Sequence, residues 1–484
     1  MFVKLPGKRG HFEDIPLLFL KIGVIISNIK GKERASLMNL ANTAFVIIAS
    51  ILVLFMTPGL AFFYGGLVSE KNVVNTMLSV FIMTGVAILL WVFLGYTLAF
   101  SGNIGGIIGN LNHAFMAGIK LTSLTATHIP VGVYSLFQMM FAIITPALFV
   151  GAVVGRIRFK FLLIFLVLWS ILIYYPMVHL VWSPAGWLAK LGVLDFAGGT
   201  VVHINAGVTA LVLSAWLGPR LTKTTSTQHY NLPWVLLGTA ILWIGWYGFN
   251  AGSALAVNGV AMQAAITSTV ATATAMVVWM FLDIWTTGKP TLVGVCTGTL
   301  CGLVAITPAA GYVTIMGSVA IGALATLASY GFIQLLKPRL GVDDALDAFG
   351  CHGVSGIVGS ILTGVFATRA VNPTITQNGL AYGGGWHLLG IQLLATGFTI
   401  ALVAVMGSVL ILILRRLTPM RVDATEERLG LDQGEHGEQA DYTVGLSERL
   451  ADFHPDQELY APEFKGQLQR LQHPTIQSPH DNGK

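Results

Sequence analysis

Residues 199–218 read GTVVHINAGVTALVLSAWLG, twenty consecutive positions without an aspartate, glutamate, lysine or arginine. A helix of that length rises by about 30 Å, which is the thickness of the hydrocarbon core of a bilayer. The one titratable side chain in the stretch is His203, which lies about 12 Å along the helix from Asp195, just before it. The segment predicts a transmembrane helix that holds an ionisable ring near the middle of the membrane.

The composition of the whole chain agrees with this interpretation. Hydrophobic residues make up 54% of the 484 residues and charged residues only 10%, whereas soluble domains carry roughly 25% charged residues. A soluble chain of this kind would expose large apolar patches, so we expect an integral membrane protein. The net charge of +5 comes from short basic runs between apolar segments, which favours membrane topology over nucleic-acid binding.

Eleven apolar runs are long enough to be spans, and they predict an all-α integral membrane protein with eleven transmembrane helices. The eleven helices form a transport domain at 41–415, between an N-terminal extension at 1–40 and a cytosolic, partly disordered tail at 416–484. The predicted spans are 41–64, 73–100, 132–155, 161–182, 199–218, 232–252, 260–282, 291–307, 311–336, 348–367 and 387–414.

Basic residues indicate the orientation, because Lys and Arg accumulate in cytoplasmic loops. The loops assigned to the outside hold only Lys120, Lys190 and Arg369. The inner loops and the start of the tail hold Lys71, Arg156, Arg158, Lys160, Arg220, Lys223, Lys289, Lys337, Arg339, Arg415, Arg416 and Arg421. We therefore expect a multi-pass cell-membrane protein whose helical body starts outside and whose C-terminus is cytosolic.

The basic residues of segment 1–40 conflict with that orientation, since the segment would be exported. Its run IPLLFLKIGVII resembles the core of a signal peptide, but Lys21 interrupts it and no clean small-residue cleavage site follows. A cleaved leader, an extra interfacial helix and a start codon assigned too far upstream all stay open.

Two parts of the chain contain similar short motifs. IITPAL at 143–148 returns as AITPAA at 305–310, and His203 in the fifth predicted span has a counterpart, His352, in the tenth. A repeat of five helices must cross the membrane in the opposite sense on its second passage. We therefore predict two inverted five-helix repeats, at about 41–218 and 232–367, an extra helix at about 387–414, and a pore between the halves.

The two histidines are the strongest functional signal in the sequence. A core histidine bonded to a carbonyl group is the structural alternative, but ionisable groups inside membranes are costly and usually mark a transport path. The tenth span starts at an acidic mouth that we assign to Asp347, and His352 lies further in. Neutral imidazoles both donate and accept hydrogen bonds, which suits a small polar solute in an apolar pore.

Other chemistry is poorly supported. The two histidines lack obvious further Cys or carboxylate ligands at membrane depth, so we expect no metal site and no cofactor. Cys296, Cys301 and Cys351 lie in apolar segments without zinc-type spacing, which predicts packing rather than a disulfide framework. No serine or cysteine nucleophile motif accompanies the histidines, so we do not expect an enzyme.

Aromatic residues gather at the outer ends of three predicted spans. Aromatic belts at the membrane interface are the ordinary explanation, but these clusters converge on one surface, where rings attract a desolvated cation and a hydroxyl can accept its proton. They contain Phe137 and Phe141 in FQMMF, Trp182 in VWSPAGW, and Trp246, Phe249 and Ser253 in WYGFNAGS. This pattern predicts a site for a small cation.

Six motifs spread over about 41–415 resemble the ammonium transporter (Amt) family of the Amt/Mep/Rh superfamily. They are MTPGLAFFYGGLV, FQMMFAIIT, LDFAGGTVVHINAG, WIGWYGFNAGSA, GLVAITPAAGYV and DDALDAFGCHGVSGIVG, and the tail segment LGLDQGEHGEQADY is also similar. The chain departs from the family pattern at Asn42, where Asp is common, at Thr267, where Asn is common, and in its leader.

The resemblance implies a function and assigns roles to residues. Ammonium would bind an outer site at Phe141, Trp182 and Ser253, with Trp246 and Phe137 lining the vestibule; Phe141 and Phe249 would form a gate, His203 and His352 the pore pair, and Asp195 a structural acid. Ammonium would lose a proton and cross as ammonia. The resemblance also implies a homotrimer and regulation by a PII-class cytosolic protein, and it leaves open an ammonium sensor with little flux and Rh-type conduction of methylamine or carbon dioxide.

Overall fold

The computed structural model describes residues 37–221 and 229–440. Within these ranges the chain is helical, and extended residues form only isolated bridges. Ten of the helices described there are long and apolar enough to cross a membrane. The predicted class, an all-helical membrane protein, is therefore confirmed.

The eighth predicted span, 291–307, corresponds to an apolar helix of only 15 residues, Leu292–Ile306, which is shorter than the ten. The count of eleven spans and the inverted repeat stay predictions. Residues 1–36 of the predicted N-terminal extension and residues 441–484 of the predicted tail lie outside the described residues.

The helical body begins with α2 (Leu40–Leu67), α3 (Val73–Leu90), which continues through the π-turn η2 (Trp91–Gly95) into α4 (Tyr96–Phe100), and α5 (Val131–Val150). The next are α6 (Phe159–Trp169), continued by η4 (Ser170–Tyr174) and α7 (Tyr175–Trp182), then α8 (Trp187–Leu191), η5 (Gly199–Ile204), α9 (Asn205–Leu217) and α10 (Leu232–Gly252). The chain goes on through α11 (Gly259–Thr287), α12 (Leu292–Ile306), α13 (Ile315–Gly331) with η7 (Phe332–Leu336) and α14 (Lys337–Leu340), η8 (Phe349–Val354), α15 (Ser355–Phe366), α16 (His387–Leu414), α17 (Ala424–Leu429) and η10 (Asp432–His436).

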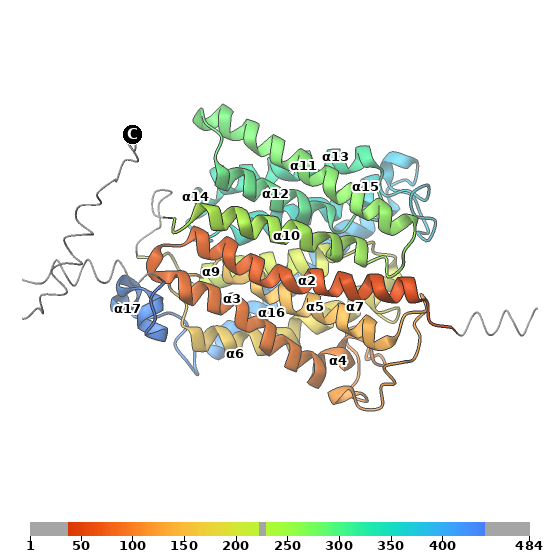
Figure 1. The fold of residues 1–484 in the computed structure, drawn as a ribbon, viewed down its shortest axis with the longest axis horizontal. Coiled ribbons are helices and arrows are strands. Elements are labelled where there is room, and N and C mark those ends of the chain that lie inside the picture. Colours follow the sequence, from red (N-terminus) through yellow and green to blue (C-terminus); the bar gives the residue numbers. More distant parts are fainter. Residues whose placement is uncertain (1–36, 222–228, 441–484) are drawn as a thin grey trace, which may run out of the picture. The chain divides into compact units, whose positions relative to one another are not determined.

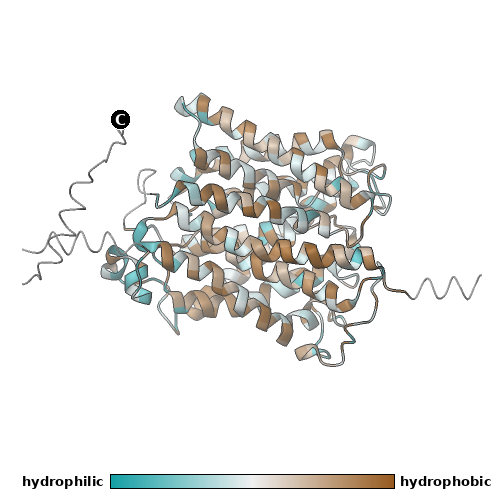
Figure 2. Cartoon of the chain, viewed as in Figure 1, coloured by the Kyte–Doolittle hydropathy of each residue, from teal (hydrophilic) through white to brown (hydrophobic). Residues whose placement is uncertain are grey.

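The long helices run side by side between two ends of the body (Figure 1). We call the end with α4, α8 and loop 367–386 the outer end and the end with α14 and α17 the inner end, following the predicted orientation. Large apolar side chains are exposed between the ends, among them Phe81, Phe281 and Leu412. Hydrophobic residues cover the helices there, while hydrophilic residues gather near α17 (Figure 2). This distribution suits lipid around the helices and water at the ends.

Two predicted spans extended into residues that form turns or loops. The third, predicted to reach 155, ends at Val150, because residues 151–156 form turns and Gly155 adopts a φ of +76°. The ninth, predicted from 311, begins at Ile315, because the Thr314 hydroxyl caps the helix by accepting from the Gly317 amide. Both errors come from apolar residues that continue past a turn.

The described part of the predicted tail packs on the inner end of the helical body. The Asp432 carboxylate accepts from the amides of Val74 and Asn75 at 3.0 and 2.7 Å, so it supplies acceptors to the first turn of α3. Arg158, just before α6, donates to Glu426 of α17 at 2.6 Å. Residues 420–438 are thus part of the folded body.

Two glycines let the segments that carry the histidines cross closely. A Cβ atom at Gly207 of α9 would lie 2.3 Å from the backbone N and Cα atoms of Gly353 in η8. Only a hydrogen atom fits in that space, which explains why Gly207 lacks a side chain, and a Cβ atom at Gly353 would lie 2.3 Å from the Phe349 ring. This contact brings η5–α9 against η8–α15.

We expect Gly207→Ala to destabilise the protein. The methyl group would force two backbones apart, and overpacking of this kind costs about 1–3 kcal/mol. The measurement is the thermal midpoint of the purified protein, with Gly397→Ala on α16 as the control, since no atom lies within 4 Å of a Cβ built there. Equal midpoints for the two variants would contradict the close crossing.

Candidate functional site

His203 and His352 each follow an aspartate that caps the start of the helix. His203 lies in η5, eight residues after Asp195, and His352 lies in η8, eight residues after Asp344. The Asp195 carboxylate accepts from the amides of residues 198–201 at 2.5–3.2 Å and from the Thr200 hydroxyl. His203 is therefore held on a capped helix start.

Asp344 caps the second helix start. Its carboxylate accepts from the amides of Ala348, Phe349 and Gly350 at 2.9, 2.8 and 3.4 Å. Burial, and then the charge of Asp347, raise the pKa of Asp344 to about 6. We expected Asp347 to be the acid at the start of the tenth span, but its side chain pairs with Lys337. The acid that matches Asp195 is Asp344.

The two imidazole rings face each other across the crossing point. Their centroids are 5.4 Å apart and their planes differ by 13°. His203 is 1% exposed and His352 is 3% exposed, so both rings lie inside the helical body rather than toward lipid. The Trp246 ring also stacks on His203, at 5.3 Å and 15°.

Ring nitrogens of both histidines are left without partners. Among the described residues, no group hydrogen-bonds to Nδ1 or Nε2 of His203 or to Nδ1 of His352, and all three atoms are buried. Buried polar atoms are nearly always paired, and an unpaired one costs about 1–3 kcal/mol. The alternative of core histidines satisfied by carbonyl groups therefore does not describe this pair.

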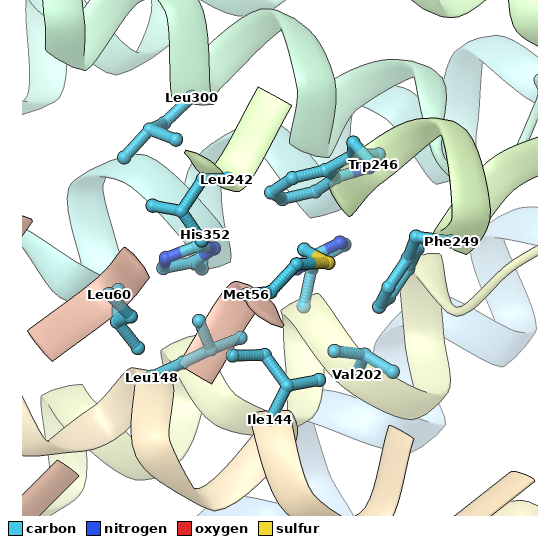
Figure 3. Close-up of a pocket in the computed structure, with 11 residues that line it drawn as sticks. Met56, Leu60, Ile144, Leu148, Val202, Leu242, Trp246, Phe249, Leu300 and His352 are labelled. Carbon is cyan, nitrogen blue, oxygen red and sulfur yellow. The ribbon is translucent and has the colours of Figure 1, made fainter. Parts of the chain in front are cut away.

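The histidines line a small cavity, which we call the histidine cavity (Figure 3). Its volume of about 10 Å³ is near the minimum that holds one water-sized molecule. The side chains around the rings are apolar or aromatic, and none carries a charge: Met56, Leu60, Ile144, Leu148, Val202, Leu242, Trp246, Phe249 and Leu300. The cavity thus admits one small molecule at a time and offers it only imidazole nitrogens as polar partners.

A larger cavity of about 150 Å³, the vestibule cavity, lies toward the outer ends of α5, α7 and α10. Four of the predicted site residues line it: Phe137, Phe141, Trp182 and Ser253. The Ser253 hydroxyl donates to the carbonyl of Phe249 at 2.8 Å, so its oxygen is left free to accept. The Trp182 indole donates to the Asp195 carbonyl at 3.1 Å, which fixes the ring beside the capped helix.

Two phenylalanines separate the cavities. Phe141 lines the vestibule cavity and Phe249 lines the histidine cavity. Their ring centroids are 4.4 Å apart, and the Phe249 ring also stacks on His203 at 5.8 Å. One ring from the lining of each cavity is thus in direct contact with the other.

The structure places Trp246 differently from the sequence-based expectation. It does not line the vestibule cavity but the histidine cavity, and its indole donates to the Thr307 hydroxyl at 2.9 Å. Because Trp246 lies seven residues before Ser253 on α10, nearly two helical turns separate them. This placement favours a role for Trp246 beside the histidines, and its assignment to the outer site stays a prediction.

The vestibule cavity contains residues that the sequence analysis missed: Tyr134, Gln138, Phe196 and Leu255. Gln138 matters most, because its buried Oε1 atom has no hydrogen-bond partner among the described residues. An amide oxygen in this position can accept from a cation. The signal was visible in the sequence, since Gln138 is the polar residue of the FQMMF motif.

The two departures from the family pattern lie outside both cavities. Asn42 donates to the Thr127 carbonyl and accepts from the Val257 amide, at 3.1 and 2.9 Å. Thr267 donates to the Ala310 carbonyl at 2.8 Å.

In the part of the chain that the structure describes, no cluster of three or more His, Cys, Asp or Glu residues is arranged to hold a metal ion.

Comparisons with known proteins agree on one family. Residues 44–441 match the model of the Ammonium Transporter Family. The chain is 47% identical to an ammonium transporter of Aquifex aeolicus over 87% of this chain and 98% of the relative. It is 44% identical to an ammonium transporter of Bacillus subtilis, over 83% and 99%.

Solved structures have the same fold. Candida albicans Mep2 superposes with a TM-score of 0.76 at 33% identity and covers 88% of this chain and 94% of its own. A protein described as a sensor Amt protein superposes with a TM-score of 0.74 at 29% identity, over 82% and 98%. The similarity therefore extends over nearly the whole helical body.

Proposed function

This chain belongs to the ammonium transporter family, and we propose that it binds ammonium in the vestibule cavity and passes ammonia along His203 and His352. The relatives named above are transporters, and none of those names denotes an enzyme. The observation that carries the proposal is the set of buried, unpaired imidazole nitrogens in an apolar cavity of molecular size.

The vestibule cavity has the chemistry of a site for a small cation. Phe141 and Trp182 present rings whose centroids are 5.5 Å apart, and each ring attracts a cation by about 0.5–2 kcal/mol. The Ser253 oxygen and the Gln138 Oε1 atom add acceptors for N–H groups. Since the lining contains no carboxylate, a cation is held there without a full counter-charge.

The histidine cavity has the chemistry of a path for a neutral molecule. Moving an intact cation to the bilayer centre costs several kcal/mol of free energy or more. The lining of the histidine cavity contains no acidic side chain to offset that cost. A neutral amine avoids most of the penalty and can hydrogen-bond to imidazole as donor and acceptor. We therefore propose that ammonium loses a proton at the Phe141–Phe249 gate before it crosses.

We expect Ser253→Ala and Gln138→Leu each to raise the KM for ammonium uptake about 2- to 10-fold, because each removes one hydrogen bond worth about 0.5–1.5 kcal/mol. The measurement is concentration-dependent uptake by proteoliposomes. Ser318→Ala is the control, since Ser318 also donates to a backbone carbonyl but lines neither cavity. A KM that stays the same in both variants would remove these acceptors from the binding site.

The capped histidines also support the inverted repeat that we propose. The same eight-residue spacing from acid to histidine occurs at Asp195 and at Asp344, on two π-turns that pack against each other. A second copy that crosses in the opposite sense would carry its cap at the opposite end of the body.

We further propose a homotrimer in the cell membrane, with the helical body starting outside, a cytosolic C-terminus and a PII-class regulator.

An ammonium sensor with little flux is the second candidate. Two observations favour it. The fold is similar to that of a sensor Amt protein, and residues 420–438 pack on the inner end of the helical body, where a cytosolic partner could bind them. A flux measurement on the purified protein in liposomes separates the candidates. Uptake that rises with ammonium concentration supports the transporter, and binding without uptake supports the sensor.

A further inference from the structure

Two of the three cysteines lie in contact behind the wall of the histidine cavity. Cys301 on α12 donates to the sulfur of Cys351 in η8, with 3.8 Å between the two Sγ atoms. Both thiols are buried, at 0% and 5% exposure. The sequence analysis assigned all the cysteines to packing, but the fold brings this pair together from positions fifty residues apart.

We propose that Cys301 and Cys351 are a redox-sensitive modification site, which hydrogen peroxide oxidises to a disulfide. Disulfide sulfurs are about 2.05 Å apart, so the two Sγ atoms have to approach by about 1.8 Å from 3.8 Å. Helix α12 packs directly against η8, and the pair already shares a hydrogen bond. The disulfide would tie the helix wall to the turn that carries His352.

The oxidation proceeds in two steps. In the first, the sulfur of one cysteine attacks a peroxide oxygen, the O–O bond breaks, and the thiol proton leaves with the departing oxygen as water, which gives a sulfenic acid. In the second, the other sulfur attacks the sulfenyl sulfur, the S–O bond breaks, and a second water leaves. Two thiols lose two electrons and two protons, and hydrogen peroxide is reduced to two waters.

Burial sets the expected rate. Both thiols are buried away from bulk water, so we expect the reaction to be slow and to need sustained exposure to oxidant. The hydroxyls of Ser329 and Ser355, 2.7 Å apart, lie beside Cys301 and provide polar groups near the reacting sulfur. Hydrogen peroxide is small and uncharged, which suits a site away from bulk water.

The pair is placed to affect the pore. Leu300 precedes Cys301 and His352 follows Cys351, and both of these neighbours line the histidine cavity (Figure 3). In a cavity of about 10 Å³, a shift of an ångström or two decides whether a molecule fits. We expect the disulfide to lower ammonium flux at least fivefold, an effect that rests on the proposed function.

The test exposes the full-length protein in proteoliposomes to hydrogen peroxide and analyses its peptides without reduction. We expect a peptide that joins Cys301 to Cys351 and has lost two hydrogens. It should be absent in Cys301→Ser and Cys351→Ser. Cys296→Ser is the matched control, because Cys296 is also buried on α12 but makes no thiol contact. Free thiols at both positions after prolonged oxidation would overturn the proposal.

Flux measured on the same vesicles tests the second part. We expect oxidation to slow uptake in the wild type and Cys296→Ser, a reductant to restore it, and Cys301→Ser to be insensitive. A disulfide that leaves flux unchanged overturns the effect on the pore but supports the modification site. Absence of uptake in the reduced wild type would instead count against the proposed function, while the peptide analysis still decides whether the thiols join.

Discussion

Replacing His203 with alanine is expected to abolish selective ammonium uptake by proteoliposomes. The ring supplies two of the unpaired nitrogens in the histidine cavity and stacks on both Trp246 and His352. Its removal takes away hydrogen bonds worth about 0.5–1.5 kcal/mol each, and a loss of 1.4 kcal/mol is already tenfold in an equilibrium. It also leaves space for water, and a wet cavity no longer rejects hydrated cations.

Two measurements are needed for His203→Ala. Ammonium uptake should fall tenfold or more, and the ratio of ammonium-driven to potassium-driven current should fall toward one. His387→Ala at the exposed start of α16 is the control for loss of a histidine as such and should behave as the wild type. Unchanged uptake together with unchanged discrimination against potassium would remove His203 from the conduction path.

The sequence was sufficient for features that depend on one segment. Apolar length alone places helices such as Gly199–Leu217 within a residue or two of the prediction, because a span has to match the thickness of the bilayer. The pairing of His203 with His352 followed from each being a rare ionisable group in such a span. These inferences need no knowledge of which helices touch.

Features that depend on packing between segments were missed. Trp246 and Ser253 share a motif, yet the turn of α10 places them in different cavities. The Cys301–Cys351 contact joins helices whose order in space is invisible in the sequence. Among three neighbouring acids, 343, 344 and 347, only the backbone shows that Asp344 caps η8. The cavities and the thiol contact depend on how separate helices pack, and the Asp344 cap depends on the backbone path at residues 344–350.

The caps themselves are expected to control whether the histidines are held in place, and Asp195→Ala is expected to have the larger effect of the two. Without the carboxylate, four amides and the Thr200 hydroxyl lose their acceptor, and each buried unsatisfied group costs about 1–3 kcal/mol. We expect loss of folded protein, measured as the monodisperse fraction in gel filtration, and loss of uptake in whatever fraction folds.

Asp344→Ala removes the acceptor of three amides, so it should follow the same course with a smaller loss. Asp423→Ala is the control, since Asp423 caps the surface helix α17 by accepting from Thr425 and Glu426; loss of such a cap costs about 0.5–2 kcal/mol but touches neither cavity. Because Asp195 and Asp344 precede their histidines by the same spacing, conservative Asn variants that fold should lower uptake at either end. Full uptake in both Asn variants would mean that the charge of the caps has no part in orienting the rings.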